Sequence, residues 1–144
     1  MVEASTIGTS RFFNSARVQV IHLDTSFLIR GLVHGSAEDR RLRNWLRRGE
    51  PLGMSAIAWA ELLCGPMETG HLDLVARIVS ERIPFGEEDA LLSSRLFNES
   101  GRRRGSLMDC MIAAAALRAG AQLATSNAYD FRRFAAQGLT LVES

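Results

Sequence analysis

The chain has 144 residues, the length of a single domain, and 47% of them are hydrophobic, which is enough to build a buried core. Its formal net charge is +1, so no bulk charge draws it to nucleic acid or to a membrane surface. No apolar run approaches the ~20 residues that a membrane span needs, and residues 1–17 lack the apolar segment of a secretory signal. We therefore expect a cytoplasmic protein with two buried free thiols, Cys64 and Cys110.

The first strong element is an apolar stretch over residues 18–23, which has the pattern of a strand buried on both faces of a parallel sheet. Residues 1–17 before it are rich in Ser, Thr and Asn and are expected to form a loose N-terminal tail, ahead of one domain over 18–144. Asp24 ends the strand, and Thr25 and Ser26 then offer caps for a helix. Open α/β sheets bind their ligands at such strand ends, so Asp24 is a candidate site residue, unless it only caps the helix.

Strands and helices alternate along the rest of the chain. We predict a helix capped by Ser36 and ended by Gly49, a short strand over 51–54, a helix over 56–64, helices marked by apolar residues at 72–79 and at 91–96, a connector or edge strand over 83–85, an Ala-rich helix over 107–119, a strand over 122–125, a helix capped by Asn127, and a final strand over 138–142. This alternation is typical of the α/β class with a mostly parallel sheet.

Four acids from distant positions are expected to meet at one edge of this sheet. In right-handed βαβ units the helices run antiparallel to the strands, so helix N-termini lie at the carboxyl ends of the strands. Asp24 follows the first strand, and Glu61 shares a face of its helix with Ile57 and Cys64. Asp109 and Asp130 each lie in the first turn of a helix.

Each of these acids also has a local explanation. Asp109 fits a capping box with Ser106, Asp130 fits one with Asn127, and Glu61 alone would be an exposed helix residue. The argument for function therefore rests on the four acids taken together. Two carboxylates ~4 Å apart repel by roughly 4 kcal/mol at an effective dielectric constant of 20. A fold that gathers several carboxylates needs a cation or a shared proton to offset this repulsion.

Oxygen ligands without His or Cys select hard ions such as Mg²⁺ or Mn²⁺. A site of this kind supports phosphoryl-transfer chemistry, because a bound ion lowers the pKa of water and stabilises a leaving oxygen. Haloacid-dehalogenase phosphatases and receiver domains also begin with a strand that ends in Asp-Thr, but both use a lysine near the acids, and this chain has none.

Four segments hold the candidate acids in order: Ile21-His-Leu-Asp24-Thr-Ser26, Ser55-Ala-Ile-Ala-Trp-Ala-Glu61-Leu-Leu-Cys-Gly65, Asp109-Cys-Met-Ile-Ala-Ala-Ala-Ala and Leu123-Ala-Thr-Ser-Asn127-Ala-Tyr-Asp130-Phe131. Together they resemble the PIN-domain ribonucleases, most closely the VapC-type toxins of bacterial toxin–antitoxin pairs. The resemblance extends over residues 20–142. It implies a three-layer PIN-like α/β fold with a central, mostly parallel sheet flanked by helices.

The resemblance also implies an activity and a set of partners. The protein would be an endoribonuclease that cuts tRNA, rRNA or mRNA, forms a homodimer and is neutralised by a VapB-type antitoxin. Its catalytic and metal-binding residues would be Asp24, Glu61, Asp109 and Asp130, with Mg²⁺ as the cofactor and Mn²⁺ as a substitute. Ser26 and Asn127 would support the site. Many relatives carry an acid where this chain has Asn127, so the fourth acidic role is given to Asp130.

The remaining predictions concern RNA and the alternative function. Arg102, Arg103 and Arg104 precede the helix of Asp109 and could contact RNA phosphates, because the arginine fork suits them; a solvated turn is the other interpretation. A non-catalytic PIN-like module that binds RNA or protein is the alternative function. Such a module would be expected to lose one or more acids, and here all four positions are filled.

Overall fold

A computed structural model describes residues 20–143 of the chain, so the expected tail over 1–17 lies outside the described residues. The elements are β1 (Ile21–Leu23), α2 (Thr25–Gly31), α3 (Ala37–Arg47), β2 (Leu52–Ser55), α4 (Ala56–Cys64), α5 (Thr69–Ile78), β3 (Glu81–Ile83), α6 (Glu87–Glu99), α7 (Leu107–Ala119), β4 (Gln122–Ala124), α8 (Ala128–Phe131) and the 3-10 helix η1 (Arg132–Gln137). None of the helices in this part of the chain has the length and apolar character needed to cross a membrane.

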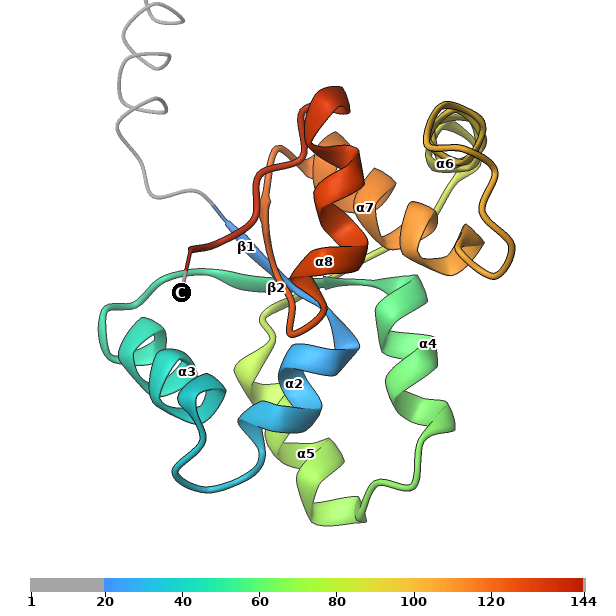
Figure 1. The fold of residues 1–144 in the computed structure, drawn as a ribbon. Helices are drawn as coiled ribbons and strands as arrows, with labels where there is room; N and C mark the ends of the chain where they lie inside the picture. Colours follow the sequence, from blue (N-terminus) through green and yellow to red (C-terminus); the bar gives the residue numbers. More distant parts are fainter. Residues whose placement is uncertain (1–19, 144) are drawn as a thin grey trace, which may run out of the picture.

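A four-stranded sheet lies at the centre, in the order β3-β2-β1-β4, and every neighbouring pair is parallel. In Figure 1, α2, α3 and α5 lie below the strands, and α6, α7 and α8 lie above them. The expected three-layer α/β architecture with a parallel sheet is therefore confirmed. The chain moves outward from β1 to β2 and β3, then crosses back to place β4 on the other side of β1. The gap between the ends of β1 and β4 is a topological switch point, where open α/β sheets bind ligands.

The core fills both faces of this sheet. Each residue of β1 and of β2 is buried, as the apolar run in the sequence predicts. On one side, the rings of Phe27 and Trp45 stack with centroids 5.5 Å apart and join α2 to α3. On the other side, α7 presents a row of buried small residues, Ala113 to Ala116, which lets the helix approach the sheet closely.

The helix starts show which side chains cap which helices. The cap of α2 is Asp24, which accepts a hydrogen bond from the Thr25 backbone N–H, so the prediction that Thr25 or Ser26 caps this helix is wrong. Ser36 and Ser55 cap α3 and α4 as expected, through bonds from the backbone N–H groups of Asp39 and Ala58.

Three expectations need correction. The final strand predicted over 138–142 is reduced to one parallel bridge between Leu123 and Leu141, which extends the sheet beside β4 by a single residue pair. The helix predicted after Asn127 is one short α-helical turn followed by 3-10 geometry. Cys110 is buried, but Cys64 is exposed; both are free thiols.

Candidate functional site

Three of the four predicted acids line one hollow of about 260 Å³ at the carboxyl edge of the sheet, next to the switch point. The residues that line it are Asp24, Thr25, Ser26, Ile29, Glu61, Asp109 and Asn127. They come from the end of β1 and from α2, from α4, from the first turn of α7 and from the loop after β4. This surface is called the acidic hollow below.

Asp24 is the most buried acid of the acidic hollow, with 4% of its surface exposed. Its Oδ1 accepts the bond from the Thr25 backbone, at 2.9 Å, and its Oδ2 accepts hydrogen bonds from the Ser26 and Thr125 hydroxyls, both at 2.8 Å. Burial raises the pKa of Asp24, and the hydrogen bonds from Thr125, Ser26 and Thr25 oppose that rise because they favour the charged form. The carboxylate is therefore held in one orientation at the end of β1.

Two hydroxyls support this carboxylate from neighbouring strand ends. Ser26 was predicted to support the site, and its Oγ also accepts a bond from the Ser126 backbone N–H at 3.1 Å. Thr125 was not predicted; it follows β4, and its Oγ1 also accepts a bond from the Asn127 backbone N–H at 2.9 Å. The only signal in the sequence is that a hydroxyl residue follows the strand over 122–124, and this signal has meaning only once that strand is known to lie beside β1.

Asp109 shows that the acids influence one another. Burial is the largest cause that raises its pKa, and the negative charge of Asp24 is the next; the charges of Asp130 and Glu61 add to it. The charge of Arg133 opposes them. Several like charges thus act on a single carboxyl group, which is the situation that a bound cation relieves.

Arg133 is a buried cation that the sequence did not reveal. Its Nη2 lies 3.7 Å from Asp109 Oδ2, its side chain is 16% exposed, and its guanidinium lies 4.6 Å from the centre of the Phe134 ring. Its three guanidinium nitrogens are buried and have no hydrogen-bond partner among the described residues. Arg132 and Arg133 stand side by side between Phe131 and Phe134, and nothing in this sequence indicates which of the two arginines is buried.

The fourth predicted acid, Asp130, does not line the acidic hollow. Its Oδ1 instead lies 3.3 Å from Arg103 Nη2, and its side chain is 32% exposed. The capping alternatives are not seen either, since neither Ser106 nor Asn127 makes a side-chain cap bond. Asn127 lies in the acidic hollow, as a supporting residue would.

The three arginines before α7 have different surroundings. Arg103 pairs with Asp130, whereas Arg102 donates to the Asn98 side chain and lies over the Phe97 ring. Arg104 is exposed. Their predicted contact with RNA phosphates remains a prediction, and two of the three already have partners within the protein.

The donor chemistry of the acidic hollow fits a hard divalent cation, because it offers carboxylate, hydroxyl and amide oxygens. Within residues 20–143, however, no three His, Cys, Asp or Glu side chains are grouped closely enough to hold an ion together. Mg²⁺ is usually bound through one or two carboxylates and keeps several waters. The hollow therefore fits a water-rich site on Asp24 and Asp109 better than a cage of four acids.

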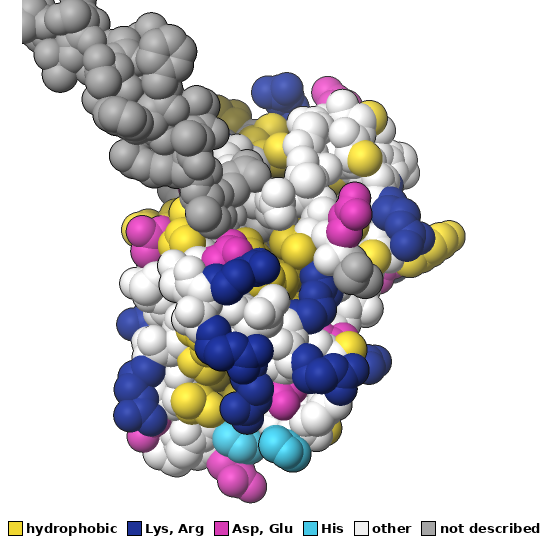
Figure 2. All heavy atoms as spheres, turned by 90° about the vertical axis from the view of Figure 1, so that its left-hand side faces the viewer, with side chains coloured by type: hydrophobic (Ala, Val, Ile, Leu, Met, Phe, Trp, Pro, Cys, Tyr) yellow, Lys and Arg dark blue, Asp and Glu magenta, His cyan; other side chains and the backbone are white. Residues whose placement is uncertain are grey.

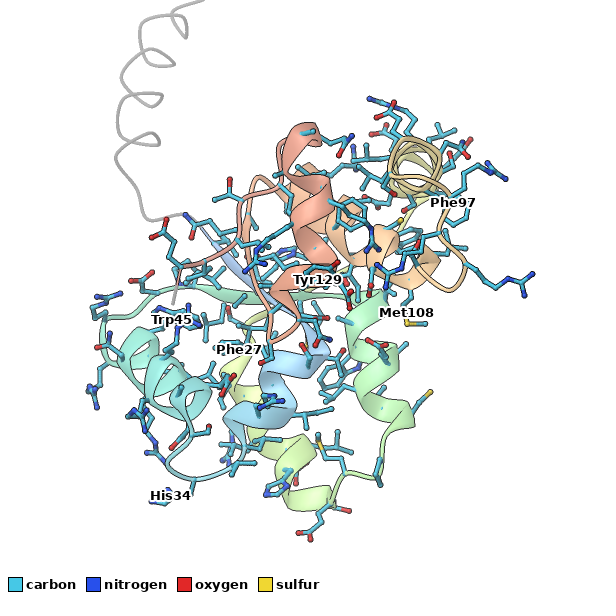
Figure 3. The ribbon with its side chains drawn as sticks, in the orientation of Figure 1. Phe27, His34, Trp45, Phe97, Met108 and Tyr129 are labelled. Atoms are coloured by element: carbon cyan, nitrogen blue, oxygen red, sulfur yellow. The ribbon has the colours of Figure 1, made fainter. Side chains whose placement is uncertain are left out.

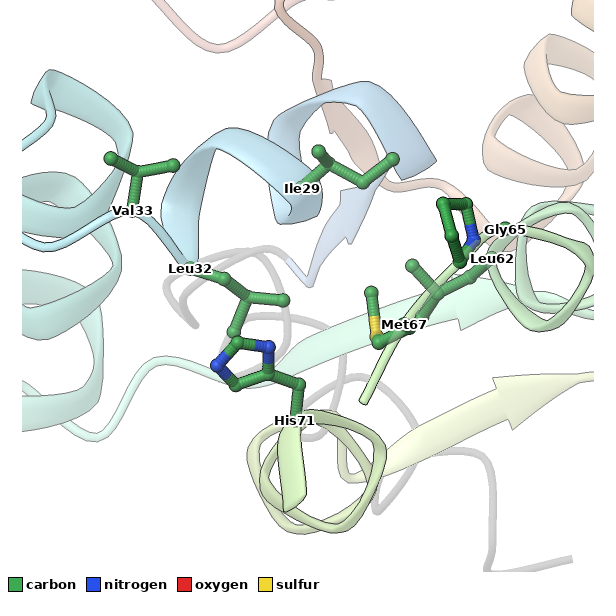
Figure 4. Close-up of a pocket in the computed structure, with 8 residues that line it drawn as sticks. Ile29, Leu32, Val33, Leu62, Gly65, Met67 and His71 are labelled. Carbon is green, nitrogen blue, oxygen red and sulfur yellow. The ribbon is translucent and has the colours of Figure 1, made fainter. Parts of the chain in front are cut away.

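A second hollow, of about 230 Å³, adjoins the first through Ile29 and is mostly apolar. Figure 4 shows side chains from α2, α4 and α5 around it, with His71 on one side. It carries no acid, so it offers no ligand for a hard cation.

The comparisons with known proteins agree with this geometry. The fold is similar to VapBC2 from Rickettsia felis bound to a DNA fragment from its promoter (TM-score 0.70, 22% identity, 85% of this chain and 97% of that chain). It is also similar to VapBC-1 from nontypeable Haemophilus influenzae (TM-score 0.65, 23%, 86% and 97%) and to VapC20 from Mycobacterium tuberculosis, a toxin that cleaves the sarcin–ricin loop (TM-score 0.61, 18%, 86% and 99%).

At these identities the solved structures establish the fold. No curated protein sequence matches the chain. The PIN-domain family model matches residues 21–137, from β1 to the end of η1. Because this match spans most of the chain and includes all four predicted acids, the chain belongs to the PIN-domain family.

Proposed function

We propose that this protein is a metal-dependent endoribonuclease of the VapC type. The observation that carries the proposal is the meeting of Asp24, Glu61 and Asp109 in one hollow at the switch point of a PIN-domain sheet. The solved structures of similar fold include VapBC toxin–antitoxin complexes and an RNA-cleaving toxin, which favours RNA over other phosphodiesters.

Asp24 and Asp109 would hold a Mg²⁺ or Mn²⁺ ion, with Glu61 acting through a bound water. Such an ion supplies an activated water and stabilises the leaving oxygen of a phosphodiester. Ser26 and Thr125 keep the Asp24 carboxylate pointing in one direction through their hydroxyls. Arg133 offsets part of the negative charge beside Asp109, which allows the acids to stay close in the fold. Asp130 would lie at the edge of the acidic hollow, paired with Arg103, and would not bind the ion directly.

The partners follow from the same proposal. An antitoxin of the VapB type would silence the enzyme, and two copies of the chain would form a homodimer; both partners would be found in the cytoplasm. Apolar side chains are available for such contacts, since Leu63, Leu107 and Met108 are 50%, 52% and 44% exposed.

One observation favours a second candidate function, a non-catalytic module that binds RNA or protein. It is the spacing of the acids, which brings no three together around one point in the described part of the chain. This candidate predicts RNA binding or partner binding without cleavage.

The deciding experiment compares RNA cleavage by the wild type, by Asp24→Asn and by Asp109→Asn, each with Mg²⁺, with Mn²⁺ or with EDTA. We expect at least a ~100-fold loss of cleavage in each case, because both variants remove a carboxylate charge that holds the ion and EDTA removes the ion itself. Asp73→Asn is the matched control, since Asp73 is exposed on α5 away from the acidic hollow. Equal cleavage by all four proteins, or cleavage that EDTA does not affect, would contradict the proposal.

A further inference from the structure

A groove lies between α3 and the loop after β4, beside the acidic hollow, and we propose that it binds the sugar–phosphate backbone of single-stranded RNA. The inference rests on the proposed nuclease function, and it identifies the surface along which an RNA substrate would reach the acidic hollow. The groove measures about 660 Å³, and its lining includes Glu38, Arg40, Arg41 and Arg47 of α3 and Thr125 and Ser126 of the loop after β4. Figure 2 shows dark blue arginine side chains gathered on the face that carries α3.

The charge of the groove suits a polyanion. Three of its side chains are arginines and one is a glutamate, so its formal charge is +2. Glu38 is partly engaged, since its Oε2 accepts a hydrogen bond from Ser126 Oγ at 2.9 Å. None of the three arginines forms an ion pair with another described residue, whereas Arg43 and Arg48, the other two basic side chains of this helix region, pair with Asp39 and Glu50.

Arg41 gives the groove a fixed cation. Its guanidinium lies 5.3 Å from the centre of the Phe27 ring and 5.2 Å from that of Trp45, and its Nη2 donates to the Glu143 carbonyl at 2.7 Å. An arginine held in this way loses little side-chain entropy when it contacts a phosphate. Arg40, which precedes Arg41 and donates to the Gly35 carbonyl, and Arg47, more than one turn further along α3, are both exposed and can contact phosphates.

The groove leads to the acidic hollow because the two share a wall. Thr125, Ser126 and Ala128 line the groove, and Asn127, between them, lines the acidic hollow. The Thr125 hydroxyl that donates to Asp24 belongs to this wall. A strand of RNA that lies along α3 therefore passes directly from the arginines to the residues that would cut it.

An exposed aromatic ring that directly follows the groove wall in the chain favours single-stranded RNA. Tyr129 follows Ala128 at the start of α8 and is 79% exposed, the highest value among the large hydrophobic side chains described as exposed. Figure 3 labels it near the middle of the molecule, on α8. Unpaired bases stack on such rings, which a base inside a duplex cannot do.

The test measures RNA binding in EDTA, where no metal-dependent cleavage interferes. The probe is a 5′-fluorescein-labelled, 12-nucleotide single-stranded RNA of mixed sequence, and binding is followed by fluorescence polarisation at several salt concentrations. The double variant Arg40→Gln/Arg47→Gln is compared with Arg43→Gln/Arg48→Gln, which removes the same charge from the same helix region outside the groove. Melting curves check that both doubles are folded.

We expect the groove double variant to bind about tenfold more weakly and to lower the slope of log K against log salt by about 1.4, or about 0.7 per lost phosphate contact. The control double variant keeps the wild-type slope. Tyr129→Ala should weaken binding about fivefold at every salt concentration, and Tyr129→Phe should restore it, because stacking does not depend on salt.

Equal losses of RNA affinity in the two double variants would contradict the groove proposal, since such losses would reflect net charge alone. Unchanged RNA binding, together with lost retention of a co-expressed antitoxin, would also overturn it and make this face a protein-docking surface. Failure of the nuclease proposal looks different: the wild type would cleave no RNA with Mg²⁺ or Mn²⁺, while the groove double variant still bound RNA more weakly than its control. If the wild type cleaves RNA but the two double variants bind RNA equally well, the nuclease proposal stands and the groove proposal is contradicted.

Discussion

Asp24 has two roles that sequence reasoning treats as alternatives. One oxygen of its carboxylate caps α2, and the other accepts hydrogen bonds from Ser26 and Thr125. Its place at the end of a buried strand made Asp24 a candidate, because open α/β sheets bind ligands there, but the functional prediction rested on the set of four acids. This reasoning did not predict the hydroxyl of Thr125, although Thr125 directly follows β4, because the contact becomes apparent only once β4 is placed beside β1.

The charge of Arg133 leads to a prediction about pH. Arg133 lowers the pKa of Asp109, which burial and the neighbouring acids raise, so Arg133→Met lets that pKa rise further. Less Asp109 is then ionised at mildly acidic pH. We expect RNA cleavage by Arg133→Met to fall several-fold more at pH 5.5 than at pH 8, relative to the wild type. Arg132→Met is the control, because Arg132 is exposed. Parallel profiles for the wild type and Arg133→Met would argue against a direct electrostatic role.

His22 should make the stability of the fold depend on pH. It is 2% exposed in β1, its Nε2 has no hydrogen-bond partner among the described residues, and burial lowers its pKa from 6.5 to about 4. Between these pH values the unfolded chain binds the proton and the folded chain does not, so stability is lost as the pH falls from 6.5 towards 4. The loss attributable to His22 reaches about 3 kcal/mol.

The measurement is urea unfolding of the wild type and of His22→Leu between pH 7 and pH 4. Leu has a size similar to that of the imidazole and does not titrate. Asp24 and Asp109 have raised pKa values and act in the opposite direction, but they are present in both proteins and cancel in the difference. The free energies of the two proteins should move apart in favour of His22→Leu as the pH falls. A constant difference across this range would show that His22 does not carry the effect.

At the scale of elements, α7 is the helix whose packing places a site residue most directly. Its buried face is built from alanines, and Asp109 lies in its first turn. The Ala-rich pattern predicted this helix over 107–119, and Gly120 ends it in the left-handed conformation with φ of 66°. The prediction was too long where the local pattern was weak, as in the final strand over 138–142, which is a single bridge at Leu141.

We predict that Ala114→Leu destabilises the fold by about 1–3 kcal/mol, because Ala114 is fully buried and the larger side chain overfills its site. The melting temperature should fall by about 5 °C or more. Ala119→Leu, at an exposed position of the same helix, should change it by no more than about 2 °C. Calorimetry on the three proteins gives the comparison, and equal melting temperatures would mean that α7 is less tightly packed than described.

For the whole molecule, the order β3-β2-β1-β4 explains both the success and the failure of the sequence predictions. Parallel strands put their carboxyl ends on one edge, so Asp24, Glu61 and Asp109 could be placed there from the chain alone. The same rule placed Asp130 at that edge, where it pairs with Arg103 outside the acidic hollow. Side-chain direction and arginine pairing depend on tertiary contacts that no spacing in the sequence encodes. The same is true of the buried cation Arg133 and of the groove along α3.

The most direct test of this account is a crystal soaked in Mn²⁺, with anomalous scattering recorded at the manganese edge. We predict an anomalous peak in the acidic hollow, with the ion about 2.1 Å from a carboxylate oxygen of Asp24, Asp109 or both, and with waters in the remaining positions. The peak should be absent from Asp24→Asn crystals treated in the same way. An empty hollow in wild-type crystals, from a protein that still cleaves RNA in the same Mn²⁺ solution, would contradict the account.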